Sequence, residues 1–277
     1  MKDNSITITP LGTVSPYCKD NKNCPGFLIS KNNKRILLDC GEGISRMLNL
    51  STDLNNLIII ISNLHKDHYS GLLNIGYASY VYKNLGYLKD RIKVYIPNED
   101  IFSDIEHYED EDGWGCSRKV NRQIIDYEYL TNFNTENYLM FENYNETKRI
   151  TYGDLEISFK TNPHQLKTYS TKITGDEGTI VYSSDTGYQN NRLESFAKNA
   201  DLLICDSTFL KGQYKSEDSH LYAYEAAEIA KKANVKQLML THFWPEIDKQ
   251  RYVVEAKEIF ENTIAAEEGK KLILRKQ

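Results

Sequence analysis

The segment LIIIISNLHKDHYSG, residues 57–71, passes from an apolar run directly into a cluster of polar side chains. The run begins with one leucine and four isoleucines, and β-branched residues of this kind are typical of buried strands. It is followed by Asn63, His65, Asp67 and His68. Because histidine and carboxylate side chains just beyond a strand are typical of metal and catalytic sites, the segment predicts a core strand that leads into a functional loop.

Similar apolar runs recur along both halves of the chain. We predict strands at residues 6–11, 35–39, 57–62, 92–96, 155–160, 179–183, 201–206 and 237–241. Apolar residues at helical spacing predict helices at residues 222–233 and 252–264. Strands that alternate with helices favour a layered α/β architecture, and 277 residues with 40% hydrophobic content are enough for one large domain. We therefore predict a single domain over residues 1–277.

The composition changes between about residues 102 and 146, where acidic, tyrosine and asparagine residues dominate. Two interpretations remain open. The segment is either an insertion that forms a lid over the site or a solvated connection with some helix.

Composition and charge argue against several classes of partner. The net charge of −5 argues against a broad nucleic-acid surface, which needs clustered lysine and arginine. The longest apolar run, residues 57–61, is far shorter than the roughly 20 residues of a membrane span. Five cysteines in no paired pattern favour a reducing, cytoplasmic location. Cys18 and Cys24 could form a metal clip, but no second pair lies near them in the sequence.

Four of the six histidines follow predicted strands closely. His65 and His68 follow residues 57–62, His164 follows residues 155–160, and His242 follows residues 237–241. Asp185 follows residues 179–183 in the same way. Zinc and similar ions bind histidine nitrogen and carboxylate oxygen that converge from distant segments, so these positions are candidate metal ligands.

Six short motifs resemble, in chain order, those of the metallo-β-lactamase superfamily. They are LGT at 11–13, LLDCGEG at 37–43, HKDHYSGL at 65–72, YSSDTG at 182–187, DLLICDSTF at 201–209 and LMLTHFWP at 238–245. The branch they resemble contains ribonuclease Z and smaller phosphodiesterases, among them phage anti-Pycsar cyclic-nucleotide phosphodiesterases. The resemblance implies an α/β fold of the four-layer αββα type and a homodimer.

The resemblance also implies a set of ligands for one or two ions of zinc, with manganese as a possible substitute. His65 and His164 would hold a first ion, Asp67, His68 and His242 a second, and Asp185 would bridge the two. Asp67 would also have a catalytic role, because it would help to orient the attacking hydroxide. Asn63 stands where the superfamily has a third histidine of the first site. Because a neutral amide binds a divalent ion less strongly than imidazole does, we expect Asn63 to be a weak or absent ligand.

Three further residues receive roles from the resemblance. His220 would donate a proton to the leaving oxygen, and Asp206 would orient the His220 ring, although the family usually has glutamate at that position. The alternative for His220 is a surface helix cap beside Asp218 and Ser219. Asp39 would accept a ring N–H from a ligand histidine.

The substrate prediction rests on a missing segment. Ribonuclease Z enzymes of the tRNA-processing type carry a long arm between the equivalents of His164 and Asp185, and this chain has only a short interval there. We therefore expect a phosphodiesterase that cleaves a cyclic or small nucleotide with metal-activated water. Aromatic residues beside the motifs are candidates for stacking a base: Tyr69, Tyr188, Phe243 and Trp244. Packing in the core is an alternative that explains each of them at least as well.

Other functions stay open at this point. One is a nucleotide-binding or regulatory protein with a degenerate metal site. Another is a tRNA 3′-end endonuclease, or a lactone, thioester or other ester hydrolase of the same superfamily.

Overall fold

The computed structural model describes residues 5–97, 105–109, 115–119, 138–188, 192–213 and 220–275. Most of the predicted insertion at 102–146 lies outside these residues. Its described parts are the antiparallel pair β6 (Ile105–Glu109) and β7 (Gly115–Lys119), and a third strand, β8 (Leu139–Tyr144). Because β8 pairs with β5 in a large sheet, the end of the predicted insertion belongs to the body of the fold.

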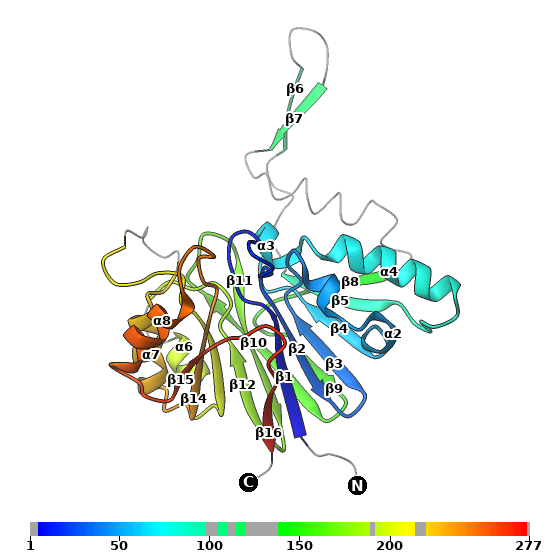
Figure 1. Cartoon of the computed structure of the whole chain (residues 1–277). Helices are drawn as coiled ribbons and strands as arrows, with labels where there is room; N and C mark the ends of the chain where they lie inside the picture. Colours follow the sequence, from blue (N-terminus) through cyan, green and yellow to red (C-terminus); the bar gives the residue numbers. More distant parts are fainter. Residues whose placement is uncertain are drawn as a thin grey trace.

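Two seven-stranded sheets form the centre of the molecule (Figure 1). The first has the order β16 (Leu272–Arg275), β1 (Ser5–Gly12), β2 (Gly26–Lys31), β3 (Lys34–Leu38), β4 (Leu57–Ile60), β5 (Ile92–Pro97), β8. The second has the order β15 (Thr263–Ala265), β14 (Gln237–Thr241), β13 (Leu202–Asp206), β12 (Gly178–Tyr182), β11 (Thr168–Gly175), β10 (Leu155–Asn162), β9 (Arg149–Tyr152).

Helices cover the outer face of each sheet. The described helices are α1 (Ile44–Met47), α2 (Leu50–Asp53), α3 (Lys66–Tyr69), α4 (Leu72–Asn84), α6 (Arg192–Phe196), α7 (Ala223–Lys232) and α8 (Lys249–Lys257). Helices α1 to α4 pack on the first sheet through one apolar cluster, and α6 to α8 pack on the second through another. A third cluster joins the inner faces of the two sheets. Three apolar interfaces between four layers confirm the predicted αββα sandwich.

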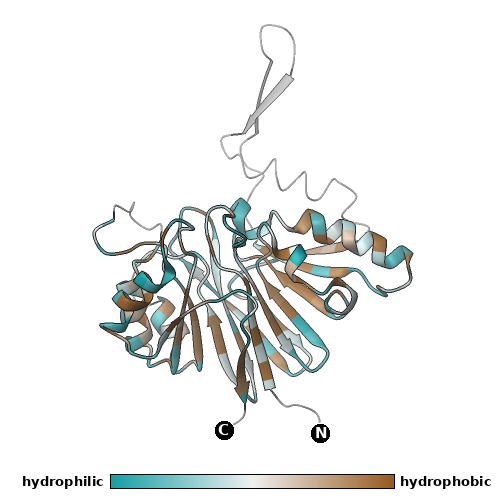
Figure 2. Cartoon of the chain, in the orientation of Figure 1, coloured by the Kyte–Doolittle hydropathy of each residue, from teal (hydrophilic) through white to brown (hydrophobic). Residues whose placement is uncertain are grey.

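Strand β4 shows how the two sheets and the helices pack against one another. In β4, Ile58 and Ile60 point into the cluster between the sheets, whereas Leu57 and Ile59 point into the cluster under the helices. Side chains alternate along a strand, so a strand buried on both faces needs an unbroken apolar run. Figure 2 shows this as strands in the hydrophobic colour through the middle of both sheets.

All eight predicted strands are present, with ends that shift by one or two residues. The helix predicted at 222–233 is α7. The helix predicted at 252–264 is partly wrong, because α8 ends at Lys257 and Thr263–Ala265 forms β15 beside β14. An edge strand of three residues is too short to show an alternation of apolar and polar residues in the sequence. Its place beside β14 depends on tertiary pairing.

Parallel pairing brings the ends of several strands to one edge. Strands β3, β4 and β5 run parallel in the first sheet, and β12, β13 and β14 run parallel in the second. Strand β10 runs in the same direction as β12, because both are antiparallel to β11. In Figure 1 this edge is at the top, beside α3, and both chain termini lie at the opposite end.

None of the described helices combines the length and the apolar character that crossing a lipid bilayer requires.

Candidate metal and catalytic site

The candidate residues other than His220 lie at the end of a strand at this edge or just beyond it, and His220 lies just before α7. Residues 63–68 follow β4, His164 follows β10, Asp185 follows β12, Asp206 ends β13 and His242 follows β14. Within the described residues, three overlapping groups of these side chains place their ligand atoms within 4.8 Å of one another. The groups are His65–His164–Asp185, Asp67–His68–His242 and Asp185–Asp206–His220–His242. The fold therefore brings together residues as far apart in the sequence as Asp67 and His242.

The tightest convergence lies around one oxygen of Asp185. Its Oδ1 is 3.1 Å from His68 Nε2 and 3.0 Å from His242 Nε2. Asp67 Oδ2 lies 3.6 Å from the same nitrogen of His68 and 3.5 Å from that of His242. We call these four side chains the Asp67–His242 cluster. These two imidazoles and two carboxylates, which follow the three strands β4, β12 and β14, are a donor set that suits a divalent ion.

The buried atoms of this cluster fit a metal ion. His68, Asp185 and His242 are 0%, 1% and 3% exposed. Among the described residues, His68 Nε2, Asp185 Oδ1 and His242 Nε2 have no hydrogen-bond partner of acceptable geometry. Buried polar atoms without partners are costly, and here the three point at one another. A cation between them would satisfy all three.

The outer nitrogen of each ring is already engaged. Asp39 Oδ2 lies 2.7 Å from His68 Nδ1, and since a carboxylate only accepts, the ring nitrogen donates. Thr208 donates its hydroxyl to Asp206 Oδ1 at 2.8 Å, so its oxygen accepts from His242 Nδ1, also at 2.8 Å. Both contacts place a proton on Nδ1 of the ring. In the neutral ring, Nε2 faces the cluster and carries the lone pair that a metal ligand needs. Asp39 makes the contact that its predicted role requires, and the role itself stays a prediction. The contact of Thr208 was not predicted from the sequence.

Asp67 is held by a residue far away in the sequence. Ser15, which is buried, donates its hydroxyl to Asp67 Oδ2 at 2.8 Å. This contact, too, was not predicted from the sequence. Ser15 lies shortly after the LGT motif, but a serine there carries no pattern that names its partner.

The cluster is a network of opposite charges. Burial alone would raise the pKa of Asp67 and of Asp185, but the imidazoles of His68 and His242 hold both pKa values below the usual range. Burial would lower the pKa of His68, but Asp185, Asp39 and Asp67 raise it well above the ordinary value. The carboxylates therefore favour positive charge at this point. A divalent ion would supply that charge in place of a proton, so its affinity should increase with pH.

The first predicted site is less complete. His65 Nδ1 lies 3.4 Å from Asp185 Oδ2 and 3.3 Å from His164 Nε2. Asn63 is fully buried beside them, and its amide has a defined orientation. The backbone N–H of His65 donates to the Asn63 side chain at 2.8 Å, so the contacted atom is the amide oxygen. The amide nitrogen then donates to Asp185 Oδ2 at 3.1 Å.

This orientation explains the unusual asparagine. The Asn63 oxygen is occupied by the His65 backbone, and the NH₂ group that faces Asp185 has no lone pair for a metal. In this arrangement Asn63 is a hydrogen-bond donor to Asp185. Its effect is to fix Oδ2 of Asp185 while Oδ1 faces the Asp67–His242 cluster.

His220 and Asp206 lie next to the cluster. His220 Nδ1 is 2.9 Å from Asp206 Oδ2, so the shorter aspartate does reach the ring. The His220 ring stacks on His242 with centroids 5.0 Å apart, and it meets His164 edge-on at 5.1 Å. Asp206 also accepts from Thr208 and from the backbone of Thr186. With its oxygens used in this way, Asp206 is suited to positioning the ring of His220. Asp218 and Ser219, the predicted neighbours of a helix cap, lie outside the described residues.

The aromatic candidates separate into core and surface. Tyr69 and Phe243 are buried in the outer clusters, so they cannot stack on a base. Tyr188 is partly exposed, and its hydroxyl contacts Glu228 and Lys232 of α7.

Trp244 packs edge-on against Phe209, with centroids 5.3 Å apart, and Phe209 lies against His220 at 6.2 Å. Of the four aromatic candidates, Trp244 is thus linked to His220 through one intervening ring.

Comparison with known proteins identifies the family. The sequence model of the family described as "Anti-Pycsar protein Apyc1" matches residues 6–261. The chain belongs to this family. Ribonuclease Z of Archaeoglobus fulgidus is 29% identical to the chain, and the match covers 94% of the chain and 95% of the relative. Ribonuclease Z of Sulfolobus acidocaldarius is 30% identical, over 93% of the chain and 95% of the relative.

A solved structure supports the fold of this Apyc1-family chain. The crystal structure of the metallo-beta-lactamase fold protein YhfI from Bacillus subtilis covers 98% of the chain, at 24% identity and a TM-score of 0.79. All of the YhfI chain is covered in turn. The predicted superfamily, its ribonuclease Z-like branch and the four-layer fold are confirmed. The protein is a member of a metallo-hydrolase family with a candidate metal site, and the role of each residue in that site stays a prediction.

We predict that Thr208→Val weakens metal binding by roughly 10- to 100-fold, because the His242 ring loses the oxygen that accepts its Nδ1 proton. Isothermal titration with zinc measures the effect. Thr241→Val is the matched control, since Thr241 is also buried and its hydroxyl has no hydrogen-bond partner among the described residues. Equal affinities of the two variants would show that Thr208 does not orient His242.

We predict that Asn63→His increases the amount of metal bound per chain, because an imidazole would add a ligand beside His65 and His164. Elemental analysis of dialysed protein measures the stoichiometry. Asn63→Ala is the control, since it removes the amide without adding a ligand and should not raise metal content. Unchanged stoichiometry in Asn63→His would mean that position 63 does not face the first site.

Proposed function

We propose that the protein is a metal-dependent phosphodiesterase that hydrolyses a cyclic or small nucleotide with metal-activated water. The observation that carries this proposal is the convergence of the buried Nε2 atoms of His68 and His242 on Asp185 Oδ1, with no hydrogen bond to satisfy them. Membership of the Apyc1 family supports the choice of substrate class.

The chemistry divides between the ion and the side chains. A divalent ion at this site would make a water molecule more acidic and would neutralise charge that develops on phosphate oxygens. Asp67, His68, Asp185 and His242 are the residues that would hold it. Asp39 and Thr208 orient the two rings, and Ser15 orients the Asp67 carboxylate.

His220 is suited to donating a proton to the leaving oxygen. Burial alone would lower the pKa of His220, but the charge of Asp206 and the hydrogen bond to it raise that pKa to about 9. Without an ion nearby, this pKa favours a protonated ring at neutral pH. A nearby divalent ion would repel this charge and lower the pKa towards neutrality, where a general acid works best.

The short connection between β11 and β12 favours a small substrate. Gly175 pairs with Gly178, so only Asp176 and Glu177 form the turn, in the interval where tRNA-processing relatives carry an arm. Without an arm, and with a net charge of −5, a folded RNA has few cationic contacts.

Two other functions remain candidates. Relatives named ribonuclease Z align over nearly the whole chain, which keeps a tRNA 3′-end endonuclease in consideration. A nucleotide-binding protein with a degenerate metal site is favoured only by the departure at Asn63. Zinc as the ion, manganese as its substitute, a homodimer and a cytoplasmic location also remain predictions.

A substrate panel tests the proposal. With zinc or manganese present, we expect turnover of bis(p-nitrophenyl) phosphate and of at least one cyclic mononucleotide, and no cleavage of a precursor tRNA. Asp67→Ala should abolish turnover, since it removes a carboxylate from the cluster. Asp176→Ala, at an exposed turn, is the matched control and should keep it. Metal-loaded protein that is inert on all substrates would favour the binding function, and cleavage of precursor tRNA alone would favour the endonuclease.

A leaving-group comparison tests His220. We predict that His220→Gln lowers kcat about 10²- to 10⁴-fold on a cyclic nucleotide, whose ribose oxygen leaves poorly without a proton. The loss on bis(p-nitrophenyl) phosphate should be much smaller, because p-nitrophenolate is a stable anion. Metal content, measured in parallel, should not change. Equal losses on both substrates would contradict a proton-donor role and would instead indicate that His220 contributes to metal binding.

A further inference from the structure

A tight turn at residues 18–24 brings two cysteines together. Lys19 pairs with Lys22, and the Lys22 N–H donates to the Lys19 carbonyl at 2.9 Å. The two central residues, Asp20 and Asn21, have φ values of 51° and 62°. Positive φ at both positions is the signature of a type I′ turn, and aspartate and asparagine tolerate it well.

The cysteines on either side of this turn are in contact. Cys18 Sγ lies 3.7 Å from Cys24 Sγ and 3.3 Å from the carbonyl oxygen of Glu42. Both are free thiols, and burial raises the pKa of each. Cys18 is partly exposed and Cys24 is buried. The Cys18 thiol can therefore react with a reagent from solution, and the buried Cys24 thiol lies in contact with it.

We propose that Cys18 and Cys24 are a redox-active pair that closes to an intramolecular disulfide by exchange with a low-molecular-weight disulfide such as glutathione disulfide. The sulfur atoms must approach from 3.7 Å to about 2.05 Å. Both flank a two-residue turn, so the approach needs side-chain rotation and a small adjustment of the turn.

The exchange balances in two steps. The Cys18 thiol loses its proton and attacks one sulfur of glutathione disulfide, which forms a mixed disulfide and releases one glutathione. The Cys24 thiol then loses its proton and attacks the Cys18 sulfur, which releases the second glutathione. The two protons end on the two released thiols. The cysteine pair is oxidised by two electrons and glutathione disulfide is reduced by two.

A metal clip explains the pair less well. Zinc in a structural site takes four ligands. Among the described residues, neither cysteine belongs to a group of three or more histidine, cysteine or carboxylate side chains placed to hold an ion.

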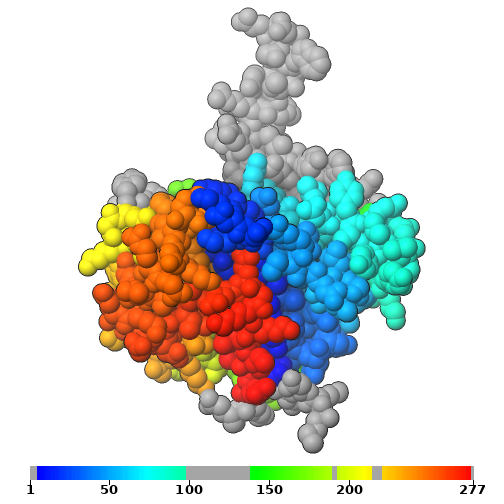
Figure 3. Space-filling model, in the orientation of Figure 1, coloured from blue at the N-terminus to red at the C-terminus, as the bar shows by residue number. Residues whose placement is uncertain are grey.

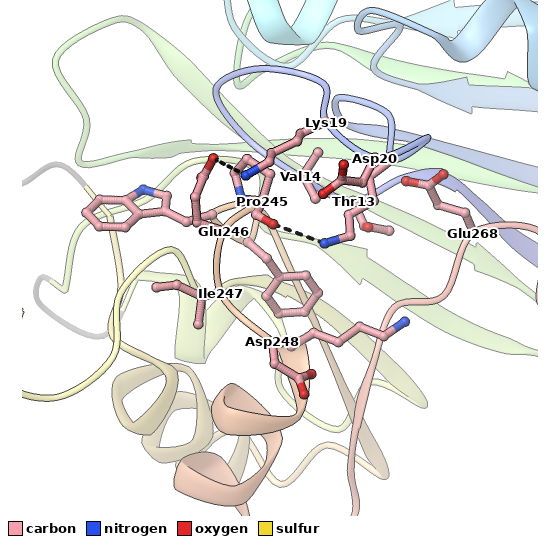
Figure 4. A pocket seen from close by; sticks show the side chains of 13 residues that line it. Thr13, Val14, Lys19, Asp20, Pro245, Glu246, Ile247, Asp248 and Glu268 are labelled. Atoms are coloured by element: carbon pink, nitrogen blue, oxygen red, sulfur yellow. Dashed lines mark hydrogen bonds and ion pairs between the residues drawn. The ribbon is translucent and has the colours of Figure 1, made fainter.

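The chain around the turn contacts the candidate site through Ser15 and contacts the loop after His242 through Lys19 and Lys22. On one side, Ser15 precedes the turn and donates to Asp67. On the other, Lys22 Nζ donates to the Pro245 carbonyl at 3.0 Å, and Lys19 pairs with Glu246 at 3.1 Å (Figure 4). Residues 243–248 directly follow His242 and line a cavity of about 520 Å³ together with the turn.

Through these contacts, a Cys18–Cys24 disulfide would affect the Asp67–His242 cluster. In Figure 3 the dark blue N-terminal segment lies directly against the orange C-terminal part of the chain. A disulfide would limit motion of the segment that touches Asp67 through Ser15 and the loop after His242 through Lys22. We expect it to slow release of metal from the Asp67–His242 cluster. This consequence rests on the proposed function, whereas the disulfide itself does not.

Peptide mapping tests the pair. The full chain is incubated in glutathione and glutathione disulfide at varied ratios, quenched with acid, alkylated and digested with trypsin. Trypsin cleaves after Lys19 and Lys22, so a disulfide would hold together two peptides that otherwise separate. We expect this linked pair to form in the wild-type chain and in the control Cys116→Ser, and to be absent in Cys18→Ser, whose folding is checked by thermal melting. A persistent glutathione adduct on Cys18 without linked peptides would overturn the proposal. So would zinc that protects both cysteines from alkylation while no linkage forms.

A second measurement tests the coupling to the site. Zinc-loaded protein, oxidised or reduced, is mixed with a chromogenic chelator, and the rate of metal loss is followed. We expect at least a twofold slower loss in the oxidised form, and no redox dependence in Cys18→Ser. Equal rates in protein that carries the linked peptides would overturn the coupling. A chain that binds no metal would instead contradict the proposed function, and the peptide result would stand independently.

Discussion

The carboxylate of Asp39 joins the two sheets at the edge where the candidate site lies. It follows β3 of the first sheet and accepts the hydroxyl of Tyr182, in β12 of the second sheet, at 2.7 Å. It also accepts the Ser62 backbone N–H at 2.7 Å and hydroxyl at 2.8 Å, together with His68 Nδ1. A fully buried carboxylate is costly unless it is well hydrogen-bonded, so this arrangement holds the end of β4 and the ring of His68 in one position relative to the second sheet.

Close backbone packing around Asp39 adds a second constraint. The loop after Asp39 passes so near α3 that a Cβ on Gly41 would lie 2.1 Å from the Asp67 carbonyl oxygen. Gly43 has a φ of +88° at the start of α1, a conformation that favours glycine. The glycines of the DCGEG motif thus let this loop support the segment that carries Asp67 and His68.

The charges at the site explain why Asp185 needs partners on both oxygens. Oδ1 lies between two imidazole nitrogens, and Oδ2 accepts from the Asn63 amide. In a site with a histidine at position 63, a second ion could take the place of that amide proton. The Asn63 amide therefore gives Oδ2 of Asp185 a hydrogen-bond donor, in the place where a second cation would otherwise satisfy this oxygen.

Local sequence determined much of this protein. The unbroken apolar run of β4 specified a strand buried on both faces. The motifs after the strands resemble those of the metallo-β-lactamase superfamily, and this resemblance was enough to predict the αββα fold and the candidate ligands. Tertiary structure alone decided the contacts of Ser15 with Asp67 and of Thr208 with His242, the direction of the Asn63 amide, and the pairing of β15 with β14. Each of these features depends on which groups the fold brings within hydrogen-bonding distance of one another, about 3 Å. A hydroxyl or an amide can form hydrogen bonds with many kinds of partner, and the packing of the fold decides which partner it has.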